Sequence, residues 1–504
     1  MISLLPPTGG AKLFTHRDAP SADDLSTLDA VLLLLPVDGR PSQRLPQSTL
    51  WQSLHQRQKP AHGQVRLATL PISGQHIAAV AYCRAEASAF EVLSVAGKLV
   101  KQALALHPQA KRIGVLAPGG SAARQLLWQE SLFAAASAQA FALPSDKAVA
   151  ADAPPPVQLT RVDLYQAAEL DVRRVQATAD AGNLVRHLTA LPPNVLDAAG
   201  YRRALGQLAR RHGLKLRWYN EAALRKLGAG AFLAVSRGNG ARDAGIARLS
   251  YRPRGKAPSA PDVTLVGKGI LFDTGGTNLK PHRSMLDMHT DMAGSAVALA
   301  SLIALAQTRA PLAADAWLAI TENNIGPRAY RPQEIVRAAN GTTIQIIHTD
   351  AEGRMVLADT LALAARDKPA LMIDYATLTG ACVYALTERL SGVFSNREAL
   401  LAPAVAAGTA SGERVWSFPL YEDFDSDIES SIADVAQCAV DGKGDHMLAA
   451  RFLQRFVPET LPWLHVDLSS ATRRGGLAHV GTEITGFGVR FTLSLLLDQK
   501  RPAT

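Results

Sequence analysis

The feature that most constrains the fold of this chain is a pair of acids, Asp350 and Glu352, that stands shortly after an apolar run. Residues Ile344–Ile347 are predicted to form a buried strand, and the segment from Gly353 onward a helix. Between these segments stand Asp350, Glu352 and, two residues later, Arg354. If the strand continued this far, both acids would point to the same side, and two close carboxylates raise each other's pKa unless cations neutralise them. The pattern indicates either a metal site or an acidic helix N-terminus, where Asp and Glu are favoured.

A second stretch places charged side chains inside apolar sequence. Residues Val263–Gly276 read as an apolar strand that is interrupted by Lys268 and Asp273. Asp291 directly precedes a small-residue helix predicted over Ala293–Gln307. Lysine and aspartate are costly to bury unless they are paired or bind metal. Together the two stretches offer four carboxylates, enough to balance two divalent cations, and an amine that becomes a ligand when neutral. We therefore expect a two-metal site.

These motifs resemble those of the two-zinc cytosolic leucyl aminopeptidases. The resemblance covers about residues 180 to 495, with the order and spacing of the motifs intact. It rests on Val266-Gly267-Lys268-Gly269, Asp273-Thr274-Gly275-Gly276, Lys280, Asp291-Met292, Tyr330-Arg331-Pro332, His348-Thr349-Asp350-Ala351-Glu352-Gly353-Arg354, Thr377-Leu378-Thr379-Gly380 and Gly486-Phe487-Gly488-Val489.

The resemblance implies a peptidase that removes N-terminal residues by means of a metal-activated water. Two divalent ions, zinc or manganese, would lower the pKa of the water and bind the free amino terminus of the substrate. Lys280 would stabilise the oxyanion with a fixed positive charge, although an exposed loop lysine is the competing interpretation. Arg354 would hold a bicarbonate ion that relays protons as the general base. The implied metal ligands are Lys268, Asp273, Asp291, Asp350 and Glu352.

The pocket for the first side chain of the substrate is where the chain departs from the family pattern. The residues implied to line or border it are Met288, His348, Ala351, Thr377, Leu378 and Gly380. Position 348 is usually asparagine; a histidine there either narrows and polarises the pocket or is a plain hydrogen-bonding substitute. A second departure is the loop Asp441-Gly442-Lys443-Gly444-Asp445-His446. Our hypothesis is a broad preference for apolar N-terminal residues.

The pattern of strands and helices predicts an α/β fold in two parts. Residues 1–150 are expected to form a smaller N-terminal α/β domain with parallel strands. Residues 151–192 are expected to hold a proline-rich linker, Ala151–Pro156, and a connecting helix from Asp163 to Leu191. Residues 193–504 are expected to form the catalytic metallopeptidase domain, with a central mixed sheet flanked by helices and the site at the carboxyl ends of its strands.

The amino-acid composition limits the cellular compartment and the binding partners that we expect for this protein. The three cysteines form no CxxC pair, the N-terminus does not resemble a signal peptide, and no run approaches the ~18 apolar residues of a membrane-spanning helix. We therefore expect a cytoplasmic protein without membrane contact. The family implies a homohexamer acting on peptides. The net charge of +9 is spread along the chain, which leaves DNA binding, with peptidase activity secondary or absent, as the alternative function.

Overall fold

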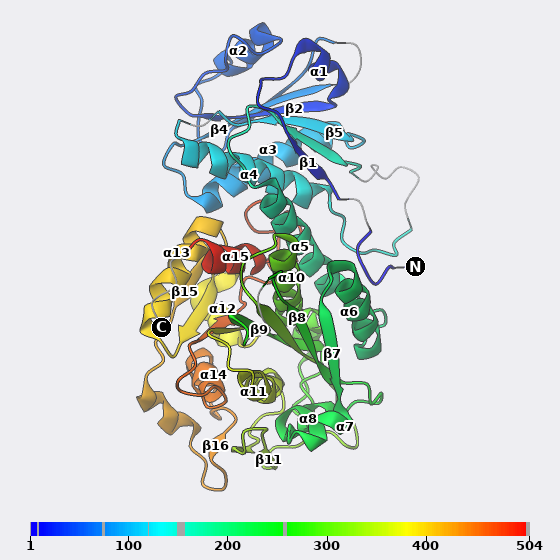
Figure 1. Ribbon diagram of the computed structural model, residues 1–504, viewed down its shortest axis with the longest axis vertical. Coiled ribbons are helices and arrows are strands. Elements are labelled where there is room, and N and C mark those ends of the chain that lie inside the picture. The colour runs from blue at the N-terminus through cyan, green and yellow to red at the C-terminus, as the bar shows by residue number, and fades with distance from the viewer. Residues whose placement is uncertain are drawn as a thin grey trace.

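The protein consists of a smaller N-terminal α/β part and a larger C-terminal α/β part, one above the other in Figure 1. The computed structural model describes residues 2–7, 10–72, 76–118, 120–148, 157–255 and 260–499. The linker predicted over Ala151–Pro156 lies outside the described residues. This architecture confirms the predicted fold class.

The N-terminal part is built on a six-stranded sheet with the order β1-β6-β5-β2-β4-β3. All neighbouring strands are parallel except β3 and β4, in agreement with the predicted parallel arrangement. Its elements are β1 Lys12–Thr15, α1 Ala22–Thr27, β2 Ala30–Pro36, α2 Ser48–Gln56, β3 Val65–Thr69, β4 Ile77–Cys83, α3 Ala89–Leu106, β5 Arg112–Leu116, α4 Ala122–Ala140 and β6 Arg161–Leu164.

The sixth strand corrects the helix that we expected to begin at Asp163. Residues Arg161–Leu164 pair with both β1 and β5, and the helix, α5, runs only over Val172–Ala190. Asp163 is fully buried in this strand, where it forms ion pairs with Arg112 and Arg161. The frequent charges of the segment belong partly to this network and not to one solvent-exposed helix. The N-terminal sheet therefore includes residues beyond position 150.

The C-terminal part surrounds a mixed eight-stranded sheet with the order β15-β14-β17-β13-β9-β10-β8-β7. The four central strands are parallel, whereas β8, β7 and β14 are antiparallel to a neighbour. The strands are β7 Lys215–Asn220, β8 Gly245–Tyr251, β9 Val263–Asp273, β10 Ala314–Asn323, β13 Met372–Ala376, β14 Ser391–Ser395, β15 Val415–Ser417 and β17 Trp463–Asp467.

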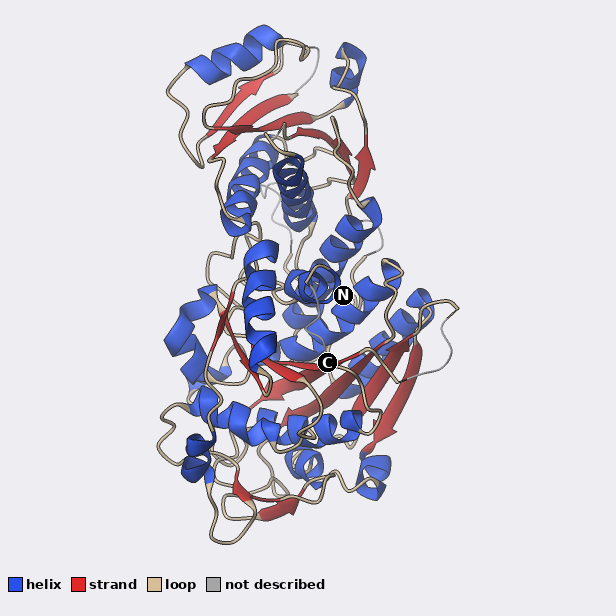
Figure 2. Ribbon diagram, turned by 60° about the vertical axis from the view of Figure 1, so that its left-hand side comes forward, coloured by secondary structure: helices blue, strands red, loops and turns tan. Residues whose placement is uncertain are grey.

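Helices cover both faces of this sheet, as Figure 2 shows. One apolar core joins the sheet to α5, α6 Ala198–His212, α10 Ala293–Gln307, α13 Leu401–Ser411 and α15 Val489–Leu497. A second core on the other face contains α7 Glu221–Lys226, α8 Gly230–Ser236, α11 Glu352–Ala365 and α14 Asp445–Gln454. Shorter helices, α9 His282–Met285, the 3-10 turn Met288–Thr290 and α12 Gly380–Leu386, lie in the connections.

The central strand β9 shows why a lysine is buried in an apolar run. Its side chains alternate between the two faces: Val263 and Leu265 belong to the core beside α10, and Val266 and Ile270 to the core beside α11. Lys268 shares the face of Val266 and Ile270. The period of the strand therefore directs its ammonium group towards the start of α11.

Helix α10 is buried along almost its whole length. Within His282–Gln307, among the described residues, one helical stretch is long and apolar enough to span a membrane, which corrects the expectation that no run of the sequence is long enough. However, 83% of the apolar window is buried inside the protein. The stretch contacts β9, β10, β13 and α5, which makes it a core helix.

The strand before the two acids is shorter than predicted. Strand β12 covers Thr343–Gln345 in a small sheet with β11 Ile335–Arg337 and β16 Val435–Ala436. Asp350 lies in the turn that follows, and Glu352 is the first residue of α11. The two acids are therefore not placed by strand alternation. They converge because a turn and a helix start bring them to the same point.

Candidate metal centre

Five side chains from three parts of the sequence meet at the carboxyl ends of the central strands. Lys268 and Asp273 come from β9, Asp291 directly precedes α10, and Asp350 and Glu352 stand at the start of α11. Oxygens of Asp273, Asp350 and Glu352 all lie within 4.8 Å of one another. Four of the five side chains are buried and Asp350 is half-buried. The structure thus brings together all the residues that the sequence suggested as metal ligands.

Two lysines are interleaved with the four carboxylates. The Nζ atom of Lys268 lies 2.8 Å from Asp291 Oδ1 and 2.9 Å from Glu352 Oε1. The Nζ atom of Lys280 lies 2.9 Å from Asp273 Oδ2 and 2.6 Å from Asp350 Oδ1. Lys280 is largely buried, so the exposed-loop interpretation of this residue is wrong.

Neighbouring polar groups hold the carboxylates in place. Thr377 donates a hydrogen bond of 2.7 Å from its hydroxyl to Asp291 Oδ1, and its backbone carbonyl accepts one from Lys268 Nζ. Asn323 donates from Nδ2 to Asp273 Oδ1 at 2.8 Å and to the Thr349 carbonyl at 3.0 Å. Asn323 was not singled out from the sequence. Its place at the end of the apolar strand β10, at the same edge of the sheet, was the available signal.

The cluster carries more negative than positive charge. Four carboxylates face two ammonium groups, which leaves an excess of two negative charges if all are ionised. Burial and the neighbouring carboxylates raise the pKa of Asp350 to about 7 and that of Glu352 to about 8. Burial alone would lower the pKa of Lys268, but Asp291 and Glu352 raise it above its ordinary value. Without further cations, the proximity of the four carboxylates disfavours their full ionisation.

The residues present fit divalent cations. Asp291 Oδ2 and Glu352 Oε2 are buried oxygens without a hydrogen-bond partner in the described structure. A buried carboxylate oxygen without a partner is costly, and coordination to a metal removes this cost. Carboxylate oxygens together with an amine nitrogen are ligands that suit zinc or manganese.

Two glycines allow the backbone to approach this cluster. Gly275 has a φ of +85°, and a Cβ atom there would lie 2.5 Å from the Asn278 carbonyl oxygen and 3.1 Å from Asp350 Oδ1. A Cβ atom on Gly353 would lie 2.6 Å from Lys268 Nζ. Any larger residue at either position would displace groups of the cluster.

The C-terminal part matches a known family. Residues 183–493 match the model of the cytosol aminopeptidase family catalytic domain. The chain belongs to the cytosol aminopeptidase family. The matched segment contains every residue of the cluster.

Curated relatives in this family are similar over much of the chain. A probable cytosol aminopeptidase of Syntrophotalea carbinolica is 40% identical over 326 residues, which is 64% of this chain and 65% of the relative. One from Parasynechococcus marenigrum is 38% identical over 385 residues, 74% of this chain and 78% of the relative. The chain thus spans somewhat less than two thirds of the length of the first relative.

A solved structure resembles nearly the whole fold. The bottromycin maturation enzyme BotP, in complex with Mn, superposes with a TM-score of 0.78 and 30% sequence identity. The alignment covers 93% of this chain and 99% of BotP. None of these three proteins is described as binding DNA, so the comparisons give no support to the DNA-binding alternative.

Arg354 contacts a residue that the sequence analysis did not assign. Its guanidinium is buried, and Nη2 donates to both carboxylate oxygens of Asp445 at 2.8 Å. Nη1 donates to the Gln437 carbonyl at 3.2 Å. Asp445 lies in the segment Asp441–His446, which the sequence analysis singled out as a departure from the expected family pattern, and this was the signal in the sequence. The position at Arg354 that we expected for bicarbonate is next to a carboxylate of the chain itself.

The residues implied to form the substrate pocket differ in exposure. His348 and Gly380 are exposed, and Met288, Ala351, Thr377 and Leu378 are half-buried. Nδ1 of His348 accepts a hydrogen bond of 3.2 Å from the Asp350 backbone N–H, a contact that favours the hydrogen-bonding interpretation of this departure. A Cβ atom on Gly380 would find open space. Thr377 contacts the metal cluster through Asp291, which links the implied pocket to the candidate ligands.

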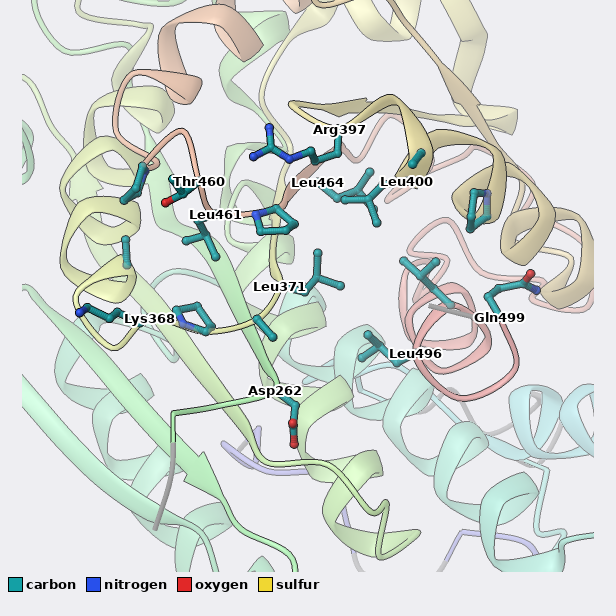
Figure 3. Close-up of a pocket in the computed structure, with 18 residues that line it drawn as sticks. Asp262, Lys368, Leu371, Arg397, Leu400, Thr460, Leu461, Leu464, Leu496 and Gln499 are labelled. Atoms are coloured by element: carbon teal, nitrogen blue, oxygen red, sulfur yellow. The ribbon is translucent and has the colours of Figure 1, made fainter. Parts of the chain in front are cut away.

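A cavity of about 920 Å³ lies at the opposite edge of the sheet (Figure 3). Its lining includes Asp262 and Leu371, which directly precede β9 and β13, and Leu464 of β17. These are the amino ends of the strands, whereas the carboxylate cluster lies at their carboxyl ends. Leucines and prolines dominate the lining. We therefore assign the chemistry to the cluster and not to this cavity.

Proposed function

We propose that this chain is a two-metal aminopeptidase that hydrolyses the N-terminal, preferably apolar, residue from peptides. The observation that carries the proposal is the convergence of four carboxylates with two unpartnered buried oxygens at the carboxyl ends of the central strands. Membership of the cytosol aminopeptidase family supports the same reaction class. The two lysines that form ion pairs with these carboxylates, Lys268 and Lys280, supply the other groups that such a reaction needs.

The five residues Lys268, Asp273, Asp291, Asp350 and Glu352 would hold the two ions. When bound, the ions supply an acidified water and polarise the scissile carbonyl. The ammonium group of Lys268 neutralises negative charge on Asp291 and Glu352 through its ion pairs with them. Bound metal ions would neutralise the same carboxylates. We infer that Lys268 releases its proton and becomes an amine ligand when metal binds. Manganese is our first choice because BotP holds it, and zinc is the second.

Lys280 would remain a cation and stabilise the oxyanion. Its Nζ atom is held between Asp273 and Asp350, so it already stands beside two of the proposed ligands. Burial by itself lowers the pKa of Lys280, but Asp273, Glu352 and Asp350 raise it above its ordinary value. A side chain that stays charged at every working pH suits the stabilisation of developing negative charge.

The first side chain of the substrate would lie near the half-buried and exposed residues around the cluster. Met288, Ala351, Leu378 and Gly380 offer apolar or minimal surfaces, and the space above Gly380 is open. Thr377 would fix the position of Asp291, and His348 that of the Asp350 backbone. These features support a broad apolar preference. By the same family membership we propose a homohexamer, which sedimentation velocity tests directly.

Metal removal followed by defined reloading tests this function. We expect that a chelator abolishes hydrolysis of leucyl and methionyl amides, and that added Mn²⁺ or Zn²⁺ restores it. An aminoacyl amide panel then gives the preference at the first position, and N-acetylated substrates should not be cleaved. Glu352→Gln is the inactive control, because it removes one proposed ligand while conserving the volume of the side chain. Activity that survives both chelation and this substitution would refute the proposal, and a preference for acidic or basic residues would refute the apolar pocket.

A further inference from the structure

The buried guanidinium of Arg354 is already neutralised by the chain itself. The exposed fraction of Arg354 is 2%, and Nη2 donates to both oxygens of Asp445 at 2.8 Å. Nη1 is bonded to the Gln437 carbonyl. A buried arginine needs an anion, because an unpaired charge in the interior is unfavourable. Asp445 supplies that anion from the first turn of α14.

Free bicarbonate does not fit this arrangement. The nitrogen Nη2, which would offer two hydrogen bonds to a planar anion, is occupied by a carboxylate of the same planar shape. A bicarbonate ion bound there would have to displace Asp445 and leave its carboxylate without the arginine. Nε of Arg354 has no hydrogen-bond partner in the described structure, so the expected external anion and Asp445 compete for Nη2.

The loop that carries Asp445 is built to reach Arg354. Gly442 and Gly444 have φ values of +67° and +60°, and Gly444 immediately precedes the helix that begins with Asp445. The other acid of the loop, Asp441, is exposed and pairs with Lys443 at 2.9 Å. Of these two acids, only Asp445 contacts a residue next to the carboxylate cluster, since Arg354 is two positions after Glu352.

Asp445 is an acid beside the cluster that is not among the proposed metal ligands. The four carboxylates of the cluster are the proposed metal ligands. Nδ1 of His348 accepts the Asp350 N–H, so the neutral ring carries its proton on Nε2 and offers a donor there. Asp445, whose exposed side-chain fraction is 24%, combines access to solvent with a fixed orientation on Arg354.

We propose that the carboxylate of Asp445 replaces bicarbonate as the anion on Arg354 and accepts the proton of the attacking water; this rests on the proposed peptidase function. As the water oxygen bonds to the scissile carbonyl carbon, one proton passes from that water to a carboxylate oxygen of Asp445. When the C–N bond breaks, the same proton passes to the leaving amine nitrogen, and Asp445 is ionised again. Arg354 keeps the carboxylate in place throughout.

Hydrolysis in buffer freed of carbon dioxide tests the wild-type protein directly. We expect that kcat is unchanged when millimolar bicarbonate is added back to the metal-loaded enzyme. Activity that falls in this buffer and returns with bicarbonate would overturn the proposal and leave the proposed function intact. A wild-type protein that cleaves no aminoacyl amide in either buffer would refute the proposed function, and this proposal with it.

Two variants at Asp445 distinguish the effect of its negative charge from the effect of its side-chain volume. Asp445→Ala should lower kcat by about 100-fold, the usual contribution of a general base, and bicarbonate or formate should restore a large part of it. Asp445→Asn should lose activity to a similar extent without rescue, because the amide fills the position but carries no charge. The exposed Asp441→Ala is the matched control and should be unaffected. An Asp445→Ala or Asp445→Asn enzyme of wild-type activity would overturn the proposal.

A binding measurement gives a readout that does not depend on turnover. In ¹³C NMR of labelled bicarbonate, we expect line broadening with metal-free Asp445→Ala and none with metal-free wild type or Asp445→Asn. The same bicarbonate concentrations should raise the Tm of Asp445→Ala alone. Equal broadening with wild type and Asp445→Ala would refute the competition for one position. If Asp445→Ala does not fold, the wild-type and Asp445→Asn measurements decide the question.

Discussion

The side chain of Lys268 passes directly over Gly353, so that a Cβ atom at position 353 would lie 2.6 Å from its Nζ atom and 2.6 Å from its Cε atom. Strand β9 and helix α11 therefore meet at a point where only hydrogen fits. Lys268 can reach Asp291 and Glu352 only because its neighbour in α11 has no side chain. The glycine is thus part of the geometry of the proposed metal centre.

We predict that Gly353→Ala impairs metal binding more than it impairs folding. The added methyl group must push the Lys268 amine away from its partners, which should lower kcat/KM at least tenfold and weaken Mn²⁺ affinity, measured by calorimetry on the metal-free protein. Gly182→Ala is the matched control, since a Cβ atom at that helical glycine would meet nothing within 4 Å. It should stabilise the protein by roughly 0.5–1 kcal/mol. Unchanged metal affinity in Gly353→Ala would contradict the prediction.

We predict that Thr377→Val weakens metal binding by about tenfold or more, because the valine lacks the hydroxyl that holds Asp291 Oδ1 at 2.7 Å. The shape of the side chain is conserved, so the Tm of the metal-free protein should change little. Thr377→Ser, which keeps the hydroxyl, should bind metal nearly as well as the wild type. The comparison requires metal titrations of all three proteins, and equal affinities would show that this hydrogen bond does not position the ligand.

We predict that His348→Asn keeps most of the activity and that His348→Ala loses about tenfold. An asparagine Oδ1 stands at the same place along the side chain as Nδ1 of histidine, so it can accept the Asp350 N–H in the same way. Alanine leaves this N–H beside the metal centre without its partner. The kcat/KM values for leucyl amide check the order. If histidine instead polarises the pocket, His348→Asn will change the ranking of substrates in the aminoacyl amide panel.

We predict a pH-dependent loss of stability in the N-terminal part when Asp163 is replaced by asparagine. Burial by itself raises the pKa of Asp163, but Arg161, Arg112 and His16 lower it well below its usual range. A carboxylate with a depressed folded-state pKa contributes stability above its unfolded pKa, and this contribution is lost as the pH falls towards the folded-state value. Asp163→Asn should therefore cost about 2 kcal/mol at neutral pH.

The difference in unfolding free energy between wild type and Asp163→Asn should shrink below about pH 4, where the unfolded-state carboxylate takes up its proton. Urea denaturation between about pH 7 and pH 3, followed by circular dichroism, measures this difference. The exposed Asp23, replaced by asparagine, is the control and should show a small effect at every pH. A difference that grows on acidification would show that the ion pairs with the two arginines are not stabilising.

Local pattern was sufficient to place the elements that carry the cluster. Helix α10 covers the predicted residues and β9 begins as expected, because long apolar runs with small residues or alternation are strong signals. Strand β9 ends at Asp273, before the predicted end at Gly276. The contact of Lys268 with Thr377 could also be expected, because the parallel strands β9 and β13 place their carboxyl ends at one edge. Asp350 follows β12 of the separate small sheet, so its convergence with them depends on the turn.

Other features depend on contacts that no local pattern reveals. The end of strand β6, Asp163 and Leu164, lies within the predicted helix, because Asp163 resembles a surface charge in the sequence and is buried only through its pairing with Arg112 and Arg161. The turn at Asp350 replaces the expected strand because the pairing of β12 ends at Gln345. The ion pair between Arg354 and Asp445 joins positions 91 residues apart, and the sequence marked only the unusual loop. The positions of two such residues in the sequence do not indicate that their side chains are in contact.

Because α10 is enclosed on every side, the half of the metal centre that it supports has no independent freedom of movement. Asp291 could shift only together with a helix packed against β9, β10, β13 and α5, which would disturb the interior of the whole C-terminal part. Variation among related sequences in what they accept should therefore concentrate on exposed positions around the cluster, such as Gly380, where an added side chain would find open space and would not repack the interior.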